Sequence, residues 1–344
     1  MAMGLYAIKH KNEEVRSKSR SGGIFTALTD YILDDIGGIV CGCKMDGVRV
    51  AVHDCTNKKE GRNLFRGSKY IESNLAWNDC FSNIGNYLKK GKKVLFSGTS
   101  CQVQGLLGII PQNLKNNLYT VDILCHNIPS GKVWDDYLTW FEKKIKATII
   151  DIDFRNKAKF GWADHTESLW TKKKVYHNKY YRDLYALGYI SRPCCSKCPY
   201  KAVTHQSDFT IGDFWGLDRV RKGTEFGDNK GVSLVIVNTD KGAELFNSIK
   251  NEVEYIQANK AECLQGALVK PYTYNAENRT KFWTDYYSRD FSFIVKKYTT
   301  NALITTTLIV SKKPGNTGKS RNKDTEFTTH LLHSEGALTR CPFP

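Results

Sequence analysis

The sequence predicts a mixed α/β fold, in which helices flank a central, mostly parallel sheet that carries added β-hairpin segments. Residues 92–98 (KKVLFSG) and 118–126 (LYTVDILCH) are apolar runs with the length of buried strands, and each leads into a segment of helical periodicity. Strand–helix–strand–helix at this spacing is typical of parallel pairing. The stretch GGIVCGCKMDGVRVAVHD has two apolar runs around an Asp-Gly turn signal, which indicates a hairpin.

The remaining elements follow from periodicity and end signals. Ser21 is the expected N-cap of a helix that begins after Gly22 and Gly23, and a second helix over about 73–90 is expected to end at the Lys-Lys-Gly of 89–91. The helix after NIPSG has an apolar face formed by Val133, Tyr137, Leu138 and Phe141. We expect further strands at 4–9, within 149–176, at 207–216 and at 231–239, and further helices at 180–190 and 240–251.

The domain organisation predicted is one domain over residues 1–311, with an N-terminal part of about 1–90 and a C-terminal part of 91–311. Beyond residue 312 the chain is rich in Lys, Thr, Ser, Asn and Gly and has no periodicity. Residues 312–344 are therefore expected to be a disordered or artificially added tail, and Cys341 is given no role.

Charge and composition narrow the class of protein. The net charge is +16, but the Lys and Arg residues are scattered, and neither an RNA-binding motif nor a helix-turn-helix signature is present. We therefore do not predict nucleic acid as the ligand, and a phosphate-rich cofactor or an acidic protein partner suits the same charge. The sequence contains no membrane-spanning run or signal peptide, so we expect a cytoplasmic protein with reduced thiols.

Cysteines give the strongest chemical signal. Cys195 and Cys198 form a C-x-x-C, a spacing that lets two thiolates converge on one metal centre. Cys101 and Cys125 each lie at or past the end of a predicted strand, where parallel sheets place their binding loops. Spacing alone leaves three alternatives: a four-thiolate [4Fe–4S] cluster, a zinc site completed by His126, or simple core cysteines beside a C-x-x-C.

The other cysteines show no ligand pattern. Cys41 and Cys43 alternate along the predicted hairpin strand and are expected to fill the core. No partner is predicted for Cys55, Cys80 and Cys263, and Cys194 is a spare beside the C-x-x-C.

Seven motifs occur in a fixed order: SRSGGIFTAL, RGSKYIES, VLFSGTSCQ, VDILCHNIPS, FRNKAKFGW, RPCCSKCPYK and SDFTIGDFWG. Together they resemble the beta subunit family of coenzyme F420-reducing hydrogenase and dehydrogenase, over roughly residues 5–300. Members of that family carry FAD and iron–sulfur centres, and pass electrons between a deazaflavin or related hydride carrier and a partner's redox chain. The resemblance thus implies an oxidoreductase with FAD, a [4Fe–4S] cluster and coenzyme F420, or another anionic hydride carrier, as candidate cofactors.

The resemblance also assigns residues. It implies that the cluster ligands are Cys101, Cys125, Cys195 and Cys198, the same set that the spacing suggested. It places the flavin pyrophosphate near Ser21, Gly22 and Gly23, and adds Ser68, Lys69, Ser97, Gly98 and Thr99 as flavin contacts. Lys69 and Asp213 are the catalytic candidates, the first as a cation near the flavin ring and the second as a partner for a cofactor hydroxyl or a loop. Lys157, with Gly161 and Trp162, is assigned to the hydride-carrier pocket.

The chain departs from the family pattern in three places. Ser100 stands where the family usually has Pro, and Asn127 stands where it usually has Gly; both changes affect loops beside a ligand. The ferredoxin-like module with which many relatives begin is absent, which implies that a separate ferredoxin or other redox protein supplies the rest of the electron path, or that the start is truncated. Two rival functions are a zinc-stabilised basic binding protein without redox activity and a reductase that uses flavin alone.

Overall fold

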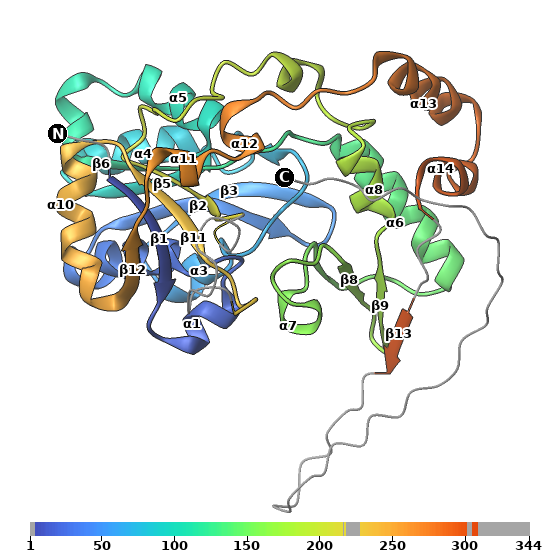
Figure 1. The fold of residues 1–344 in the computed structure, drawn as a ribbon, viewed down its shortest axis with the longest axis horizontal. Coiled ribbons are helices and arrows are strands. Elements are labelled where there is room, and N and C mark those ends of the chain that lie inside the picture. Colours follow the sequence, from blue (N-terminus) through green and yellow to red (C-terminus); the bar gives the residue numbers. More distant parts are fainter. Residues whose placement is uncertain (1–3, 216, 218–227, 301–304, 309–344) are drawn as a thin grey trace, which may run out of the picture.

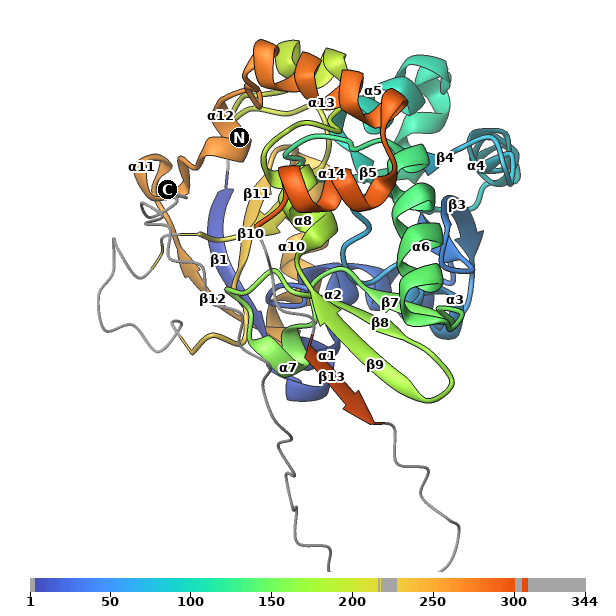
Figure 2. The same cartoon turned by 90° about the vertical axis from the view of Figure 1, so that its right-hand side faces the viewer.

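A computed structural model describes residues 4–215, 217, 228–300 and 305–308 of the chain. Helices flank a large mixed sheet, and a smaller sheet with its own helices lies beside it (Figures 1 and 2). This arrangement confirms the predicted α/β class. The predicted tail, residues 312–344 with Cys341, lies outside the described residues.

The large sheet is parallel in its middle and antiparallel towards one edge. Strands β10, β6, β5 and β2 are neighbours and pair in parallel, whereas β12, β1, β11 and β10 are joined by antiparallel pairs. The predicted hairpin is the antiparallel pair β2–β3. In spatial order the strands are β12 (Val253–Gln257), β1 (Gly4–His10), β11 (Ser233–Val237), β10 (Phe209–Asp213), β6 (Leu118–Ile123), β5 (Val94–Thr99), β2 (Ile39–Asp46), β3 (Val50–Thr56) and β4 (Ser73–Asn74).

Helices cover both faces of this sheet. Side chains of α2 and α10 join one apolar core, while α4 and α5 contribute to another that includes Phe96 of β5. The helices of this part are α1 (Glu13–Lys18), α2 (Ile24–Asp30) with a π-helical extension (Tyr31–Asp35), α3 (Lys59–Asn63), α4 (Cys80–Lys89), α5 (Ser100–Ile109), α10 (Asp240–Ile249), α11 (Lys260–Cys263) and α12 (Gly266–Val269).

The smaller sheet and its helices pack around a second apolar core that is rich in aromatic side chains. The predicted apolar face of α6 is confirmed, because Val133, Tyr137, Leu138 and Phe141 are all fully buried there. This sheet is antiparallel in the order β13 (Thr305–Leu308), β9 (Lys174–Asn178), β8 (Glu167–Trp170), β7 (Asp151–Asp153), and its neighbouring helices are α6 (Gly131–Ile145), α7 (Lys157–Phe160), α8 (Tyr180–Ala186), α13 (Ala276–Ser288) and α14 (Phe291–Tyr298).

Two predicted helix starts are wrong, each for a local reason. The predicted N-cap Ser21 instead donates its hydroxyl to the Val232 carbonyl at 2.6 Å, and the helix is preceded by Gly23 with φ 99°. The helix expected from residue 73 begins only at Cys80, because the Asn74 side chain accepts the backbone N–H groups of residues 76 and 77. Such a side-chain turn competes with helix formation.

Candidate functional site

A cavity of about 280 Å³ opens at the carboxyl ends of the central parallel strands. Ser97, Gly98 and Thr99 at the end of β5 line it, as do residues that follow β6, so the two strands contribute neighbouring walls. This is the edge at which parallel sheets bind ligands. Of the residues assigned to the flavin or the chemistry, the lining includes Ser21, Gly23, Ser68, Lys69, Ser97, Gly98, Thr99 and Asp213.

The predicted glycine turn before α2 lies at this cavity, but its first glycine has a structural task. The Gly22 N–H already donates to the Ser233 hydroxyl at 2.9 Å. A Cβ at Gly22 would lie 2.0 Å from the Ile8 carbonyl oxygen, so β1 approaches too closely for any side chain. Gly22 therefore packs the turn against the sheet, and Ser21 and Gly23 are the members of the motif that line the cavity.

Lys157 lies behind the cavity rather than in its lining. Its ammonium donates to the carbonyls of Arg16 at 2.6 Å, Lys230 at 2.9 Å and Ser21 at 3.3 Å. Burial and the nearby arginines Arg20 and Arg16 lower the pKa of Lys157 to about 8. Its position is that of a clamp on the turn that carries Ser21.

Asp213 is fixed by two donors. Its carboxylate accepts from the Arg155 guanidinium at 2.9 Å and from the Trp162 indole at 2.8 Å. Trp162 in turn stacks on Trp215 with ring centroids 4.5 Å apart. Both Asp213 oxygens are therefore engaged, and the side chain holds the β10 end of the cavity in shape.

The cavity lining is cationic. It includes Arg20, Arg66 and Lys69 but only one acidic residue within the described lining, Asp213, whose carboxylate lies 3.8 Å from the Arg20 Nε atom. The Nε atoms of Arg20 and Arg66 are buried and have no hydrogen-bond partner among the described residues. Burial lowers the pKa of Lys69 to about 8, and its ammonium donates to the Arg66 carbonyl at 2.6 Å. Unpaired guanidinium N–H groups are suited to an anionic group such as a phosphate.

A second, smaller cavity of about 40 Å³ brings the four candidate cysteines together. Cys101 lies in the first turn of α5, which the Thr99 and Gln102 capping box begins, and Cys125 lies two residues after β6. Cys195 and Cys198 come from the 3-10 turn Pro193–Lys197 and its end. We call this the four-cysteine cavity; the structure thus unites residues that are far apart in sequence.

Backbone pairing between two loops positions the C-x-x-C beside Cys125. Residues 128–130 and 190–192 pair through a Pro129–Ser191 bridge, with Ser130 N–H bonded to the Ile190 carbonyl and Arg192 N–H to the Ile128 carbonyl. This pairing brings the turn with Cys195 and Cys198 back beside the end of β6. The Lys201 ammonium, three residues further on, donates to the Cys125 carbonyl.

In this structure, no three of the four cysteine sulfurs lie as close together as the ligands of a single ion. Within the described part of the chain, no group of three His, Cys, Asp or Glu ligand atoms at this cavity lies within 4.8 Å of one another. A mononuclear zinc ion draws its ligands closer than a four-iron cube, which separates them at its corners. Burial raises the pKa of Cys125 to about 12 and also that of Cys195, so a positively charged centre would be needed to hold them as thiolates.

The two cavities share a wall. Thr99, Cys125, His126 and Asn127 line both. The Asn127 side chain is buried, and neither its oxygen nor its nitrogen has a hydrogen-bond partner among the described residues. An orphaned buried amide costs free energy unless a bound group satisfies it. The sequence marked Asn127 only as a departure from the family pattern.

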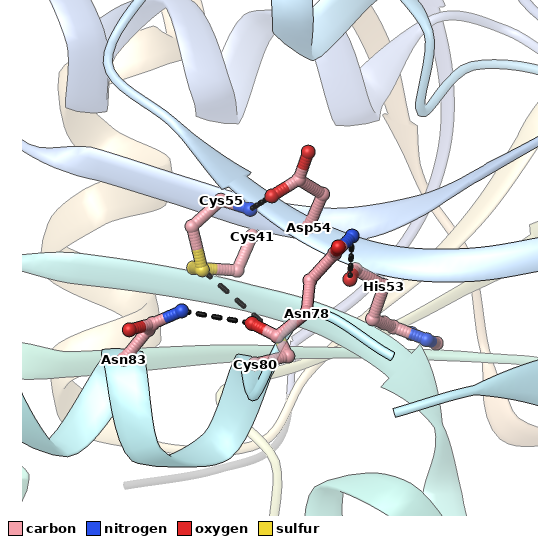
Figure 3. Close-up of a disulfide and its surroundings, with 7 residues drawn as sticks. All are labelled: Cys41, His53, Asp54, Cys55, Asn78, Cys80 and Asn83. Atoms are coloured by element: carbon pink, nitrogen blue, oxygen red, sulfur yellow. Dashed lines mark hydrogen bonds between the residues drawn. A yellow bond between two sulfur atoms is a disulfide. The ribbon is translucent and has the colours of Figure 1, made fainter. Parts of the chain in front are cut away.

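The structure corrects the expectation for four other cysteines, and the Cys41–Cys55 disulfide also differs from the expected reduced thiols. Cys41 is in the core as predicted, but it forms a disulfide with Cys55, and the Cys80 sulfur lies 3.9 Å from that of Cys55 (Figure 3). Cys43 lines the larger cavity. The signal for the pair was the hairpin register, which sets Cys41 opposite Cys55.

Within the described ranges, the structure has no helix with the length and apolarity that a bilayer crossing requires.

Comparison with known proteins finds a matching family model and similar solved structures. The family model for the C terminus of the coenzyme F420 hydrogenase/dehydrogenase beta subunit matches residues 91–262, which is half of the chain and includes all four candidate cluster cysteines. A chain of the xenon-derivatised F420-reducing [NiFe] hydrogenase complex from Methanosarcina barkeri is similar in structure, with a TM-score of 0.50 and 17% identity over 86% of this chain and 92% of that chain. At that identity the likeness shows the fold alone. None of the curated proteins matches this chain.

Proposed function

Because this chain belongs to the coenzyme F420 hydrogenase/dehydrogenase beta subunit family, we propose that it is an iron–sulfur flavoprotein that passes electrons between a hydride carrier and a partner protein. Membership of a family of hydrogenase and dehydrogenase subunits supports an oxidoreductase. The finer assignment covers FAD in the larger cavity, a [4Fe–4S] cluster in the four-cysteine cavity, and coenzyme F420 or a similar anionic carrier as the hydride source.

The observation that carries this proposal is the shared wall. A cationic cavity at the sheet edge and a cavity lined by four cysteines meet at Cys125, His126 and Asn127. Bound FAD would exchange a hydride for single electrons, and a cluster held by the four thiolates would carry those electrons onward. Two redox groups separated by one layer of side chains need no further carrier between them.

The residues present fit both groups. In the larger cavity the Nε–H groups of Arg20 and Arg66, which have no hydrogen-bond partner among the described residues, would donate to the cofactor phosphates, and Lys69 would supply positive charge near the ring. In the smaller one, four cysteines provide an all-thiolate cage. Asp213, held by Arg155 and Trp162, and Lys157, which clamps the Ser21 turn, would act as positioning residues.

The partner and setting follow from the same proposal. Electrons leaving the cluster require an external acceptor, which we propose to be a ferredoxin or another redox subunit in the cytoplasm. Cys101 is the exposed member of the four cysteines, whereas the other three are half-buried, so the α5 end of this cavity is the side nearest to solvent. We further propose that residues 1–311 act as one functional unit, since β1–β4 of the N-terminal part share the large sheet with β5, β6, β10, β11 and β12 of the C-terminal part.

The test is anaerobic purification followed by analysis of iron, zinc and flavin. We expect brown protein that releases about four irons and one FAD per chain, with visible absorbance that dithionite bleaches. Cys198→Ser should lose the iron and keep the flavin. Cys194→Ser is the matched control, because Cys194 is a neighbour that does not line the four-cysteine cavity, and it should keep both.

Two results would contradict the proposal in different ways. Colourless, zinc-loaded protein that unfolds on Cys198→Ser would support the zinc-stabilised binding protein instead. Yellow protein whose activity is indifferent to Cys101→Ser would support a reductase that uses flavin alone.

A further inference from the structure

Three cysteines outside both cavities converge on one point. Cys41 of β2 and Cys55 of β3 are bonded, and Cys80 begins α4 with its sulfur 3.9 Å from that of Cys55 (Figure 3). All three sulfur atoms lie within 4.8 Å of one another. We call these residues the three-cysteine group; among the described residues it is the one set of potential ligands with this spacing.

The chain holds the third sulfur in place by hydrogen bonds that do not involve sulfur. The Cys80 N–H donates to the Leu75 carbonyl at 3.2 Å, and the Asn78 side chain donates to the His53 carbonyl of β3 at 3.2 Å. Asn83 of α4 donates to the Asn78 carbonyl at 2.8 Å. The two contacts of Asn78, drawn in Figure 3, pin the loop before α4 to the hairpin. The approach of Cys80 is therefore a built feature rather than a chance contact.

The spacing of the sulfurs suits one metal ion. Thiolates about 2.3 Å from an ion in a trigonal plane are about 4 Å apart, and the Cys55–Cys80 separation of 3.9 Å already matches this. Only Cys41 and Cys55 would have to move apart. The ligand set is all sulfur, and Cys41 and Cys80 are 0% and 1% exposed. Sulfur-only coordination selects soft ions, and three sulfurs without a fourth ligand suit Cu(I) better than tetrahedral zinc.

We propose that Cys41, Cys55 and Cys80 form a binding site for a single soft cation of the Cu(I) type, and that the Cys41–Cys55 disulfide closes this site. An external thiol or phosphine reductant would add two electrons and two protons to the disulfide and leave two thiols. Binding of the ion would then release three thiol protons as three metal–sulfur bonds form.

This site is independent of the proposed flavin and iron–sulfur centres. It uses none of their cysteines and none of the residues that line the four-cysteine cavity. The nearest link is the hairpin itself, because Cys43 and His53, which face each other two residues along the strands from Cys41 and Cys55, line the larger cavity.

The test counts copper on the full-length chain under anaerobic conditions. Protein is reduced with a phosphine, given Cu(I), and equilibrated with a chromophoric Cu(I) chelator that strips weakly held ions. The wild type should retain one more copper per chain than Cys80→Ser. Cys263→Ser, a substitution of another buried cysteine outside the group, is the matched control and should retain as much as the wild type. Without the phosphine, the wild type should fall to the Cys80→Ser value.

Copper bound at the four-cysteine cavity does not affect this comparison. Cys80→Ser leaves that cavity intact, so any copper there is present in both proteins and cancels in the difference. Equal copper in reduced wild type and Cys80→Ser would overturn the proposal. If far-ultraviolet circular dichroism shows that Cys80→Ser does not fold, Cys55→Ser replaces it in the copper measurement. Cys55 is only half-buried, and the proposed site requires it as much as Cys80. Wild-type copper retention in Cys55→Ser would also overturn the site.

Discussion

The four-cysteine cavity and the three-cysteine group differ in how the fold brings their sulfurs together. The first takes its members from a helix start, a strand end and a late loop, and Cys101 is exposed. The second is built on a single hairpin with one helix packed on it, and Cys41 and Cys80 are fully buried. One is a surface-proximal assembly of loops, and the other is part of a core.

This difference predicts different costs of substitution. A residue in a packed core contributes to stability through its volume and its contacts. An exposed loop cysteine contributes little to the free energy of folding and matters through what it binds. Substitutions in the four-cysteine cavity should therefore change what the protein binds but have little effect on its unfolding free energy. Substitutions in the three-cysteine group should lower the unfolding free energy.

The largest expected effect on stability is at Cys41. Cys41→Ser removes a disulfide that closes a loop with a sequence separation of 14, and it buries a hydroxyl in the core. A loop of this length corresponds to about 3 kcal/mol. Urea unfolding of the oxidised, cofactor-free protein should show a loss of about this size. Cys263→Ser controls for the buried hydroxyl, and reductant should remove most of the difference. A difference that persists in full under reductant would show that the disulfide does not stabilise the fold.

A second effect should appear at His53, which lies two residues before Cys55 on β3 and lines the larger cavity. Burial holds the pKa of His53 at about 4, below its ordinary value of 6.5. The folded protein therefore binds fewer protons than the unfolded chain, so stability is full above pH 6.5 and is lost as the pH falls towards 4. At pH 5 the loss is about 2 kcal/mol.

His53→Phe should remove this part of the acid sensitivity, because Phe keeps the stacking surface against Phe96 and cannot be protonated. Unfolding free energies of the cofactor-free protein at pH 7.5 and pH 5 measure it. The variant should match the wild type at pH 7.5 and exceed it at pH 5. An equal decline in both proteins would show that His53 is protonated without penalty.

Local patterns predicted most of the fold. The strands at residues 4–9, 92–98 and 118–126 and the apolar face of α6 are where period and end signals placed them. The failures arose where a side chain found a tertiary or competing partner. Ser21 bonds to the Val232 carbonyl, more than 200 residues away, and no local rule for helix caps contains that contact.

The candidate site was predictable in its members but not in its layout. The spacing and the ordered motifs both pointed to the four cysteines, because cysteines in a C-x-x-C and at strand ends can be recognised in a sequence. The wall shared at Asn127 and the clamp formed by Lys157 depend on how distant loops meet, which periodicity does not encode. The Cys41–Cys55 pair is an intermediate case: counting outward from a three-residue loop at 47–49, with Gly47 at φ 61°, sets the two opposite each other.

A smaller effect is expected at Asn127, in the wall that the two cavities share, and it should show which of the two cavities this side chain serves. If the proposed cluster is present, Asn127 can donate its free amide to a cluster sulfur, and such hydrogen bonds raise the reduction potential. Asn127→Ala should then lower the potential of the cluster. A hydrogen bond worth about 1 kcal/mol corresponds to about 40 mV for a one-electron couple.

Redox titration followed by electron paramagnetic resonance measures that shift, and iron content controls for loss of the cluster. The flavin potential, read from visible absorbance in the same titration, shows which cavity the amide serves. An unchanged cluster potential with full iron would remove Asn127 from the cluster's surroundings.

The smallest stability effect is expected at Cys101, and it completes the comparison with Cys41. Cys101 is exposed in the first turn of α5, and serine keeps a polar side chain of similar size there. Cys101→Ser should change the unfolding free energy of the cofactor-free protein by no more than about 0.5 kcal/mol, while the same substitution lowers the iron content of protein purified anaerobically. Urea unfolding and iron analysis of one preparation test both halves. A large loss of stability without cofactor would mean that the four-cysteine cavity is held together as tightly as the hairpin, and the contrast between the two regions would then be wrong.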